Sequence, residues 1–369
     1  MMHASGFWPE ENPTQFYKVR TFVSWLLSLA LCVTLTMEVV NRITDFTKLS
    51  EILYTMVMVA SYVIKATSLR YQRKNLLKII NFLKHPIFMS YPDELDHFMA
   101  KSVRQSTFIA NAYRYSVGCC IILYLVYPIV DHKPYPFPFP FEMGSYNYYI
   151  FVFQVVGGAC CAWNNLSIDT LMTSIMGITA AQLDILCGKL IGMGNKRNDS
   201  VSRRKTDEDM SRKLKQCVNH HNAVIWLNKS VEEVFTVGLL AQFTASIIGT
   251  CNTIFHFVLM PEITSQFVML LNFFIVQMIQ LFIYCWYGNE IILKSVQVGE
   301  ACYKFTWYNN GSSVGKYIFL IMERSKRPLS ITVVKLTTLS LATFLWVMRQ
   351  SYSCLALLLK MYEKQVKEE

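Results

Sequence analysis

The sequence contains few charged residues for its length. Only 16% of its 369 residues are Asp, Glu, Lys or Arg, and 53% are hydrophobic, whereas soluble domains carry about 25% charged residues. A chain of this composition is not expected to fold around one or two soluble cores. Its apolar residues come in blocks long enough to cross a bilayer, so hydropathy is the main guide to the fold.

Patterns that indicate catalysis, metal binding or nucleic-acid binding are also missing. No Gly-rich phosphate loop, zinc-finger spacing or RNA-binding signature accompanies the net charge of +10, so we expect no nucleic-acid partner. The absence of a Ser-His-Asp or paired-carboxylate arrangement argues against an enzyme. The His220–His221 pair lacks Cys or carboxylate neighbours at metal-ligand spacing, so we predict a solvated surface there and no metal or other cofactor.

The eleven cysteines form no disulfide framework and no CxxC motif. Cys187, Cys217 and Cys302 lie in basic segments that we predict to be cytoplasmic, where thiols stay reduced. The other cysteines lie within apolar blocks and are expected to be small buried hydrophobic residues. The first 17 residues are polar. We therefore expect no cleavable signal peptide, and assign the first apolar block to a membrane span.

Seven apolar blocks follow one another along the chain. A bilayer takes roughly 20 residues to cross, and backbone amides within lipid must be satisfied inside the segment, so each block is predicted to be a helix. The sequence thus predicts an all-α protein with a single seven-transmembrane domain over residues 1–369. The predicted spans are 22–40, 52–69, 108–130, 148–186, 231–260, 267–293 and 331–359.

Two of these helices are predicted to continue beyond the membrane. Block 148–186 is nearly twice the required length, and block 108–130 follows an amphipathic stretch over 93–113 with charge on one face. Such extensions usually pack on one another. Together with segments 187–230 and 294–335 they predict a cytoplasmic anchor.

Lys and Arg are distributed unevenly between the two sides of the spans. The segments before the first span and after the second, fourth and sixth contain 25 of them, and the opposite segments contain 6. Positively charged loops stay in the cytoplasm, so this bias predicts a cytoplasmic N-terminus. With seven spans, the C-terminus is predicted to be extracellular.

A few ionisable residues lie within or near the spans, where they are expensive and are therefore functional candidates. Lys65, Asp169 and Lys335 lie near predicted cytoplasmic ends, and we expect them to snorkel toward water. Arg349 is deeper, and its role stays open. The complete set is Glu38, Lys65, Arg114, Asp169, Lys335 and Arg349.

Aromatic residues and Met gather in the predicted outer halves of the second, third, fourth and sixth spans. An interfacial aromatic belt and helix packing account for many of them. The same residues suit the lining of an apolar pocket with few polar groups, which fits a small volatile molecule. Our candidates for this ligand site are Tyr62, Tyr124, Tyr149, Phe153, Phe273 and Gln277.

The predicted outer loop over 131–147 reads DHKPYPFPFPFEMGSYN. Its alternating Pro and aromatic residues favour an extended conformation. Two interpretations stay open at this point. The loop is either a rigid surface segment or an apolar lid over an extracellular vestibule.

The last eighty residues contain a spaced set of motif residues: Trp286, Gly288, Asn289, Ala301, Tyr303, Trp307, Tyr308 and Ser351–Tyr352–Ser353. Together they resemble the C-terminal signature of insect odorant receptors. The matching elements end the sixth span, cross the last inner loop and enter the seventh span. Related gustatory receptors carry Thr-Tyr, five hydrophobic residues and Gln-Phe in the seventh span, whereas Leu358–Leu359 stands here in place of the Gln-Phe. The chain therefore resembles an odour-tuned subunit and not the shared co-receptor, which keeps that Gln.

The resemblance implies a ligand-gated, non-selective cation channel of four subunits in the plasma membrane of olfactory neuron dendrites. A tuned subunit of this kind works with a co-receptor, is surrounded by lipid and binds a small, apolar or weakly polar volatile ligand. We expect Trp307 and Tyr308 to anchor subunit contacts, and Ser351, Leu355 and Leu359 to line the pore and gate on one face of the seventh helix. Arg349 is expected to point roughly 120° away from that face.

Three alternatives remain open. A gustatory-type receptor channel shares the topology. A G-protein-coupled receptor also has seven helices, but it requires an external N-terminus and commonly a Cys in the loop after the fourth span, and the predicted loop 261–266 has none. A transporter predicts internal repeat symmetry, which the sequence does not show.

Overall fold

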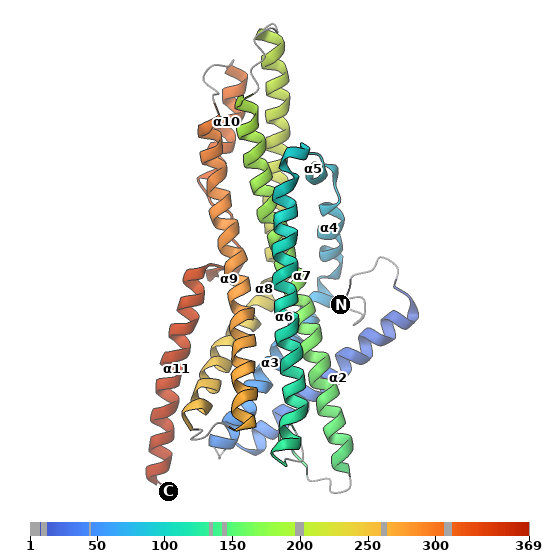
Figure 1. Cartoon of the computed structure of the whole chain (residues 1–369), viewed down its shortest axis with the longest axis vertical. Helices are drawn as coiled ribbons and strands as arrows, with labels where there is room; N and C mark the ends of the chain where they lie inside the picture. Colours follow the sequence, from blue (N-terminus) through green and yellow to red (C-terminus); the bar gives the residue numbers. More distant parts are fainter. Residues whose placement is uncertain are drawn as a thin grey trace.

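The computed structural model describes residues 8, 13–43, 46–132, 136–141, 146–195, 203–259, 264–305 and 312–368. Within these ranges the chain is an elongated bundle of helices with a small β-hairpin near its C-terminal end (Figure 1). The elements are α2 (Gln15–Asn41), α3 (Phe46–Tyr71), α4 (Arg73–Leu83), α5 (Pro86–Met89), the 3-10 helix η1 (Asp93–Leu95), α6 (Asp96–Val130), α7 (Asn147–Asn195), α8 (Arg203–Leu259), α9 (Ser265–Lys304), α10 (Ser312–Ser325), β1 (Thr332–Val333), β2 (Thr337–Thr338) and α11 (Leu341–Glu368).

Six of the described helices are long and apolar enough to cross a membrane: α2, α3, α6, α7, α8 and α9. They coincide with the first six predicted spans, and the mostly helical class is confirmed. α11 occupies the place of the seventh predicted span and has 28 residues, but it does not belong to this apolar set. The seventh span and the orientation of the chain stay predictions.

The long helices exceed the thickness of a bilayer. α7 has 49 residues, α8 has 57 and α9 has 40, whereas about 20 residues span the hydrocarbon core. α6 is one continuous helix of 35 residues, and it packs along α7. The predicted extension of the third and fourth helices is therefore confirmed. In Figure 1 the far ends of α7, α8 and α9 project together with α10 beyond the rest of the bundle.

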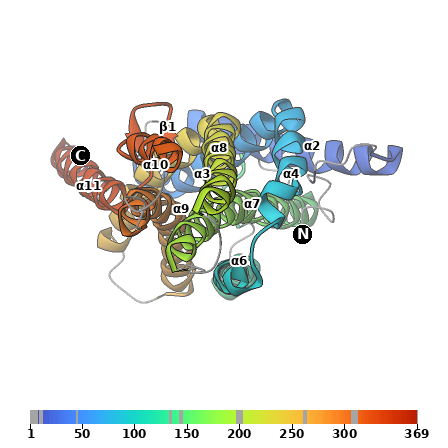
Figure 2. The same ribbon diagram turned by 90° about the horizontal axis from the view of Figure 1, so that it is seen from above.

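α7 is the central helix of the bundle. It packs against α6, α8 and α9, and Leu166, Met176 and Leu183 on it are fully buried. A helix that is apolar on all sides belongs inside a bundle, because it has no polar face to turn outward. α2 and α11 lie on opposite flanks, as the view in Figure 2 shows.

The seventh apolar block does not begin as a helix. Residues 331–338 form the β1–β2 hairpin, and α11 begins at Leu341, so the prediction of a span from Ile331 was wrong at its start. The block begins with β-branched residues, which favour extended pairing. Val334 and Lys335 in the turn have φ values of 51° and 58°, the left-handed values that a type I′ hairpin turn requires.

The hairpin is hydrogen-bonded to α8, and the residue that follows it lies against α9. The backbone N–H of Val334 donates to the hydroxyl of Thr236 on α8 at 2.9 Å. On α9, a Cβ added to Gly288 would lie 2.4 Å from the Cβ of Leu339, closer than any two carbon atoms can pack. Glycine at this position therefore allows the chain after the hairpin to lie directly on α9.

The His220–His221 pair is buried, so the prediction of a solvated surface was wrong. The two side chains are 1% and 4% exposed, because α8 is covered here by neighbouring helices. The His220 Nε2–H donates to the Gln182 side-chain oxygen at 2.9 Å, and the Gln182 amide donates to the carbonyl of Phe88 at 3.2 Å. His220 thus helps to hold α5 against α7 and α8.

Candidate functional site

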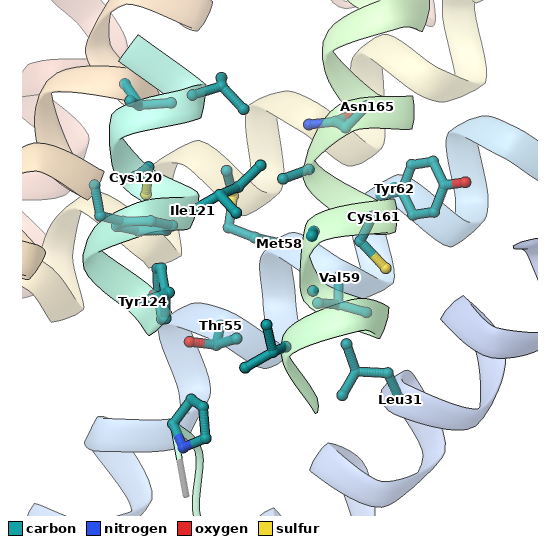
Figure 3. Close-up of a pocket in the computed structure, with 18 of the residues that line it drawn as sticks. Leu31, Thr55, Met58, Val59, Tyr62, Cys120, Ile121, Tyr124, Cys161 and Asn165 are labelled. Atoms are coloured by element: carbon teal, nitrogen blue, oxygen red, sulfur yellow. The ribbon is translucent and has the colours of Figure 1, made fainter. Parts of the chain in front are cut away.

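A cavity of about 140 Å³ lies between α3, α6, α7 and α9 (Figure 3). These are the four helices whose outer halves the sequence analysis selected for a ligand site. Leu31 of α2 and Pro136 and Phe137 of the outer loop complete the wall. Most of the lining is apolar, and the small residues Gly158 and Ala162 on α7 leave open space. A concave, mostly apolar site with few polar groups is typical of small-molecule binding.

Residues of the outer loop cover one end of the cavity. The Phe137 N–H donates to the Gln154 side-chain oxygen at 3.0 Å, and the Gln154 amide donates back to the Phe137 carbonyl at 3.0 Å. The Tyr127 hydroxyl donates to the Pro136 carbonyl, and the Phe137 ring lies 5.2 Å from that of Tyr124. The described part of the loop therefore favours the interpretation of an apolar cover over that of a free surface segment.

A buried ion pair lies at the opposite end of the cavity. Lys65 Nζ on α3 is 2.8 Å from Asp169 Oδ1 on α7, and the two side chains are 3% and 4% exposed. Lys65 also donates to the side-chain oxygen of Asn165 at 2.9 Å, and Asn165 lines the cavity. The prediction that Lys65 and Asp169 snorkel toward water was wrong, because each finds its partner inside the bundle.

The carboxylate of Asp169 accepts hydrogen bonds on both oxygens. Oδ1 accepts from Lys65 and, at 2.5 Å, from the hydroxyl of Tyr284. Oδ2 accepts from the hydroxyl of Tyr113 at 3.3 Å and from the amide of Gln280. A carboxylate can accept about four hydrogen bonds, so these four bonds use its full capacity. Such bonding and the facing ammonium compensate the loss of water around a buried charge.

The polar network continues from this ion pair to α8. The side-chain amides of Gln280 and Gln242 bond reciprocally, with distances of 2.9 and 3.1 Å. Gln242 also donates to the hydroxyl of Ser246 at 3.2 Å. The end of the cavity near the Lys65–Asp169 pair is therefore connected through Gln280 of α9 to α8. α11 packs against this same helix.

The other ionisable residues considered in the spans are arranged differently. Glu38 on α2 is buried and pairs with Arg42, the residue that follows the end of this helix. Arg114 and Arg349 are exposed on the surface of the single chain. Lys335 is exposed in the hairpin turn, so it does not snorkel from a helix as predicted.

The structure brings three of the six candidate ligand residues together on the cavity wall: Tyr62, Tyr124 and Phe273. Tyr149 is 68% exposed on α7, and Phe153 packs on the hydrophobic core beside the cavity lining. Gln277 is buried on the α8 side of α9, where it donates to the Ser246 carbonyl at 3.0 Å. Ligand binding by any of the six stays a prediction.

The three candidate pore residues lie on the side of α11 that meets α8. Ser351 is fully buried, and its hydroxyl donates within its own helix. Leu355 packs with Cys251 and Phe255 of α8, and Leu359 is a half-buried member of the same cluster. Arg349 is exposed on α11, whereas Leu355 is buried.

The candidate anchor residues Trp307 and Tyr308 lie outside the described residues. On either side of them the described chain exposes large apolar side chains. Tyr303 at the end of α9 is 79% exposed, and Phe319 and Leu320 on α10 are 56% and 55% exposed. Exposed apolar clusters outside membrane spans commonly mark interaction surfaces.

Asn165 and Gln154 line the cavity but are not among the six candidates predicted from the sequence. Lys65 and Asp169 were each recognised as charges within spans, and not as partners. Opposite charges in two different spans were a usable signal for a pair, because intramembrane charges seldom stay unpaired. The roles of the two amides depend on contacts that no local pattern encodes.

The fold and the cavity define a polytopic, helical membrane protein with an apolar cavity between its helices. The family model described as 7tm Odorant receptor matches residues 45–352. The chain belongs to this family.

Curated relatives are similar over much of their length. Putative odorant receptor 85d of Drosophila melanogaster is 24% identical, over 79% of this chain and 73% of that protein. Odorant receptor 13a of the same species is 21% identical, over 97% and 93%. Odorant receptor Or2 of Anopheles gambiae is 23% identical, over 58% and 56%.

A solved structure shares the fold. The insect olfactory receptor OR5 from Machilis hrabei, determined in complex with eugenol, superposes with a TM-score of 0.86 at 14% identity. The match covers 98% of this chain and 96% of that one. At this identity the similarity concerns the fold.

Proposed function

We propose that this chain is the odorant-binding subunit of a ligand-gated, non-selective cation channel. It works with a shared co-receptor as a tetramer in the plasma membrane of olfactory neurons, with its N-terminus in the cytoplasm. The family membership supports the receptor role, and the observation that carries the proposal is the apolar cavity between α3, α6, α7 and α9.

The cavity suits a small odorant. An apolar protein cavity of about 150 Å³ accommodates a molecule the size of benzene, and the present one measures about 140 Å³. Eugenol, named with OR5, is likewise a small aromatic molecule with few polar groups. The expected ligand is therefore small and mostly apolar, with one or two hydrogen bonds at most.

The ligand acts on the pore through intermediate helices. Among the described residues no side chain of α11 lines the cavity, whereas α9 lines it and α8 packs on α11. The network from Asp169 through Gln280 and Gln242 gives a physical route between these elements. A change in helix packing around the occupied cavity then biases the position of α11.

Current recording tests this function. Cells that express the chain with an insect odorant co-receptor are expected to show odour-evoked, non-selective cation currents across a panel of small volatiles. Cells that express this chain alone, at equal surface levels, are expected to show none. Odour-evoked currents of equal size without the co-receptor would contradict the hetero-oligomer, and G-protein-dependent responses without a channel current would contradict the whole proposal.

The same recordings locate the ligand site. Tyr124→Ala and Phe273→Ala are expected to reorder odour preference, because both side chains line the cavity. Tyr115→Ala is a matched control, since Tyr115 lies on the same helix as Tyr124 but is 74% exposed. An unchanged rank order in both cavity variants would place the ligand elsewhere, and substitutions of Tyr149, Phe153 and Gln277 would then distinguish the remaining candidates.

A further inference from the structure

Asn165 presents a hydrogen-bond donor of fixed direction to the cavity. A lysine ammonium can only donate hydrogen bonds, so the atom of the Asn165 amide that faces Lys65 at 2.9 Å is the oxygen. The amide nitrogen is therefore on the opposite side. Figure 3 shows this nitrogen directed from α7 toward the interior of the cavity.

The Asn165 NH₂ group has no hydrogen-bond acceptor within the described part of the chain. The other amides of the lining already have partners: Gln154 bonds to the backbone of Phe137, and Gln280 bonds to Asp169 and Gln242. Asn165 is thus the amide of the lining that is left to bond with a cavity occupant.

The hydroxyl groups of the lining do not require the occupant to carry a hydrogen-bond acceptor. Thr55, Tyr62 and Tyr124 line the cavity, but a hydroxyl rotates and can donate or accept as the occupant requires. The amide of Asn165 cannot reverse without turning its NH₂ group toward the Lys65 ammonium, where two donors would face each other. Asp169 in turn holds Lys65 in place at 2.8 Å.

We propose that Asn165 donates a hydrogen bond to an acceptor oxygen on the odorant, and that the Lys65–Asp169 pair fixes the direction of this donor. The ligand class is a small, mostly apolar compound that carries an acceptor oxygen, such as a ketone, ester or aldehyde, bound with that oxygen toward the Asn165 end of the cavity. This inference rests on the proposed odorant-binding function.

Matched ligand pairs test the inference. Each pair consists of a carbonyl compound and the alkene in which a CH₂ group replaces the carbonyl oxygen, for example 2-heptanone and 2-methyl-1-heptene. Both members fill the same volume, but the alkene accepts no conventional hydrogen bond. In the wild-type complex the carbonyl member of each active pair is expected to have a lower half-maximal concentration, by about fivefold, as one net hydrogen bond predicts.

Substitution of Asn165 assigns the preference to this residue. Asn165→Leu keeps the approximate volume and removes the donor, so the alkene-to-carbonyl ratio of half-maximal concentrations is expected to fall from about five to about one while the alkene response is kept. Ile121→Val is the matched control, because Ile121 lines the cavity without a polar group. It is expected to shift both members of a pair in the same direction and to preserve their ratio.

The possible results separate clearly. Equal sensitivity to both members of active pairs in the wild-type complex would overturn the proposal, and so would a preference that Asn165→Leu leaves intact. If Asn165→Leu does not reach the cell surface, Asn165→Ala and the wild-type pairs decide the question. If a correctly assembled wild-type complex shows no current with any odorant, the proposed function is overturned, and the role of Asn165 with it.

Discussion

The charges of Lys65 and Asp169 are isolated from water inside a bundle of apolar helices. Their side chains are 3% and 4% exposed, and the carboxylate is surrounded by the hydroxyls of Tyr113 and Tyr284 and the amide of Gln280. A buried pair of this kind contributes little net stability compared with well-packed apolar residues, but loss of one partner leaves an uncompensated charge. The two residues therefore depend on each other.

Lys65→Met is expected to destabilise the folded receptor by about 3–5 kcal/mol, the usual effect of removing one partner of a buried ion pair. The measurement is thermal unfolding of the detergent-solubilised protein, together with its level at the cell surface. The double variant Lys65→Met/Asp169→Asn removes the unpaired charge as well, so it is expected to recover much of the loss.

The chain provides a matched control for this prediction. Lys229 and Glu233 also form an ion pair, at 3.9 Å, but their side chains are 75% and 62% exposed. Exposed pairs contribute about 0–1 kcal/mol, so Lys229→Met is expected to have little effect. Equal unfolding temperatures for Lys65→Met and Lys229→Met would show that the buried pair is not needed for stability.

Individual residues were the hardest features to predict from the sequence. Lys65 and Asp169 stand out by their charge, but their contact joins positions 104 residues apart, and hydropathy contains no pairing information. The His220–His221 pair looked solvated because its neighbours along the chain are polar, whereas its burial comes from other helices. Tyr149 was a candidate and Gln154 was not, because the rotation of an apolar helix cannot be read without its neighbours.

At the scale of elements, α11 has two distinct faces. One face packs on α8 through Ser351 and Leu355. The other face is open in the single chain and carries Trp346, Arg349 and Leu357, with Trp346 48% and Leu357 61% exposed. A neighbouring subunit or a pore is expected to meet this open face. If the gate is at Leu355 and Leu359, the face of α11 that packs on α8 must also approach the ion path.

Leu355→Ser and Leu359→Ser are expected to raise leak current or alter ion permeation in the complex with the co-receptor. Polar side chains in a ring of leucines would keep the constriction wet, and hydrophobic constrictions gate by dewetting. The measurement is baseline current and relative cation permeability at matched surface expression.

Leu357→Ser provides the comparison from the open face of the same helix. Changes in leak or permeability with Leu357→Ser alone would assign the ion path to the open face. Wild-type properties in the Leu355 and Leu359 variants would show that the gate does not depend on those side chains.

Elements were more predictable than residues, for a physical reason. A membrane helix needs an apolar run of fixed minimum length, and such runs located α2, α3, α6, α7, α8 and α9. The start of the seventh block was mistaken because Ile, Val and Thr are apolar enough to join a span yet prefer extended structure. That preference prevailed over 331–338, where bonds to α8 and contacts with α9 stabilise a hairpin.

At the scale of the whole molecule, the far ends of α7, α8 and α9 project together with α10 beyond the rest of the bundle (Figure 1). Phe319 and Leu320 expose apolar area on α10, and Tyr303 does so at the end of α9. A single chain gains nothing from exposing these side chains to water. We expect this surface to contact other subunits, together with Trp307 and Tyr308.

Leu320→Asp is expected to weaken assembly with the co-receptor by about tenfold, because a charge would be buried in an apolar contact. Recovery of the co-receptor with the tagged chain from detergent extracts measures this effect, and Trp307→Ala is expected to act in the same direction. Glu323→Ala on the same helix is the control, since Glu323 is exposed and already polar. Normal recovery of the co-receptor and wild-type odour responses in both test variants would show that assembly does not depend on this surface.

The close contact of Gly288 with Leu339 gives α11 the geometry of a lever. The chain after the hairpin lies directly on α9 at Gly288 and the hairpin is hydrogen-bonded to α8, so we expect the start of α11 near Leu341 to act as a pivot. Leu359 lies about 18 residues further on, or about 27 Å along the helix axis at 1.5 Å per residue. With that arm, a tilt of only about 5° carries the far end of the helix through about 2 Å. Small rearrangements around an occupied cavity are thereby magnified at the end of α11 most distant from the hairpin.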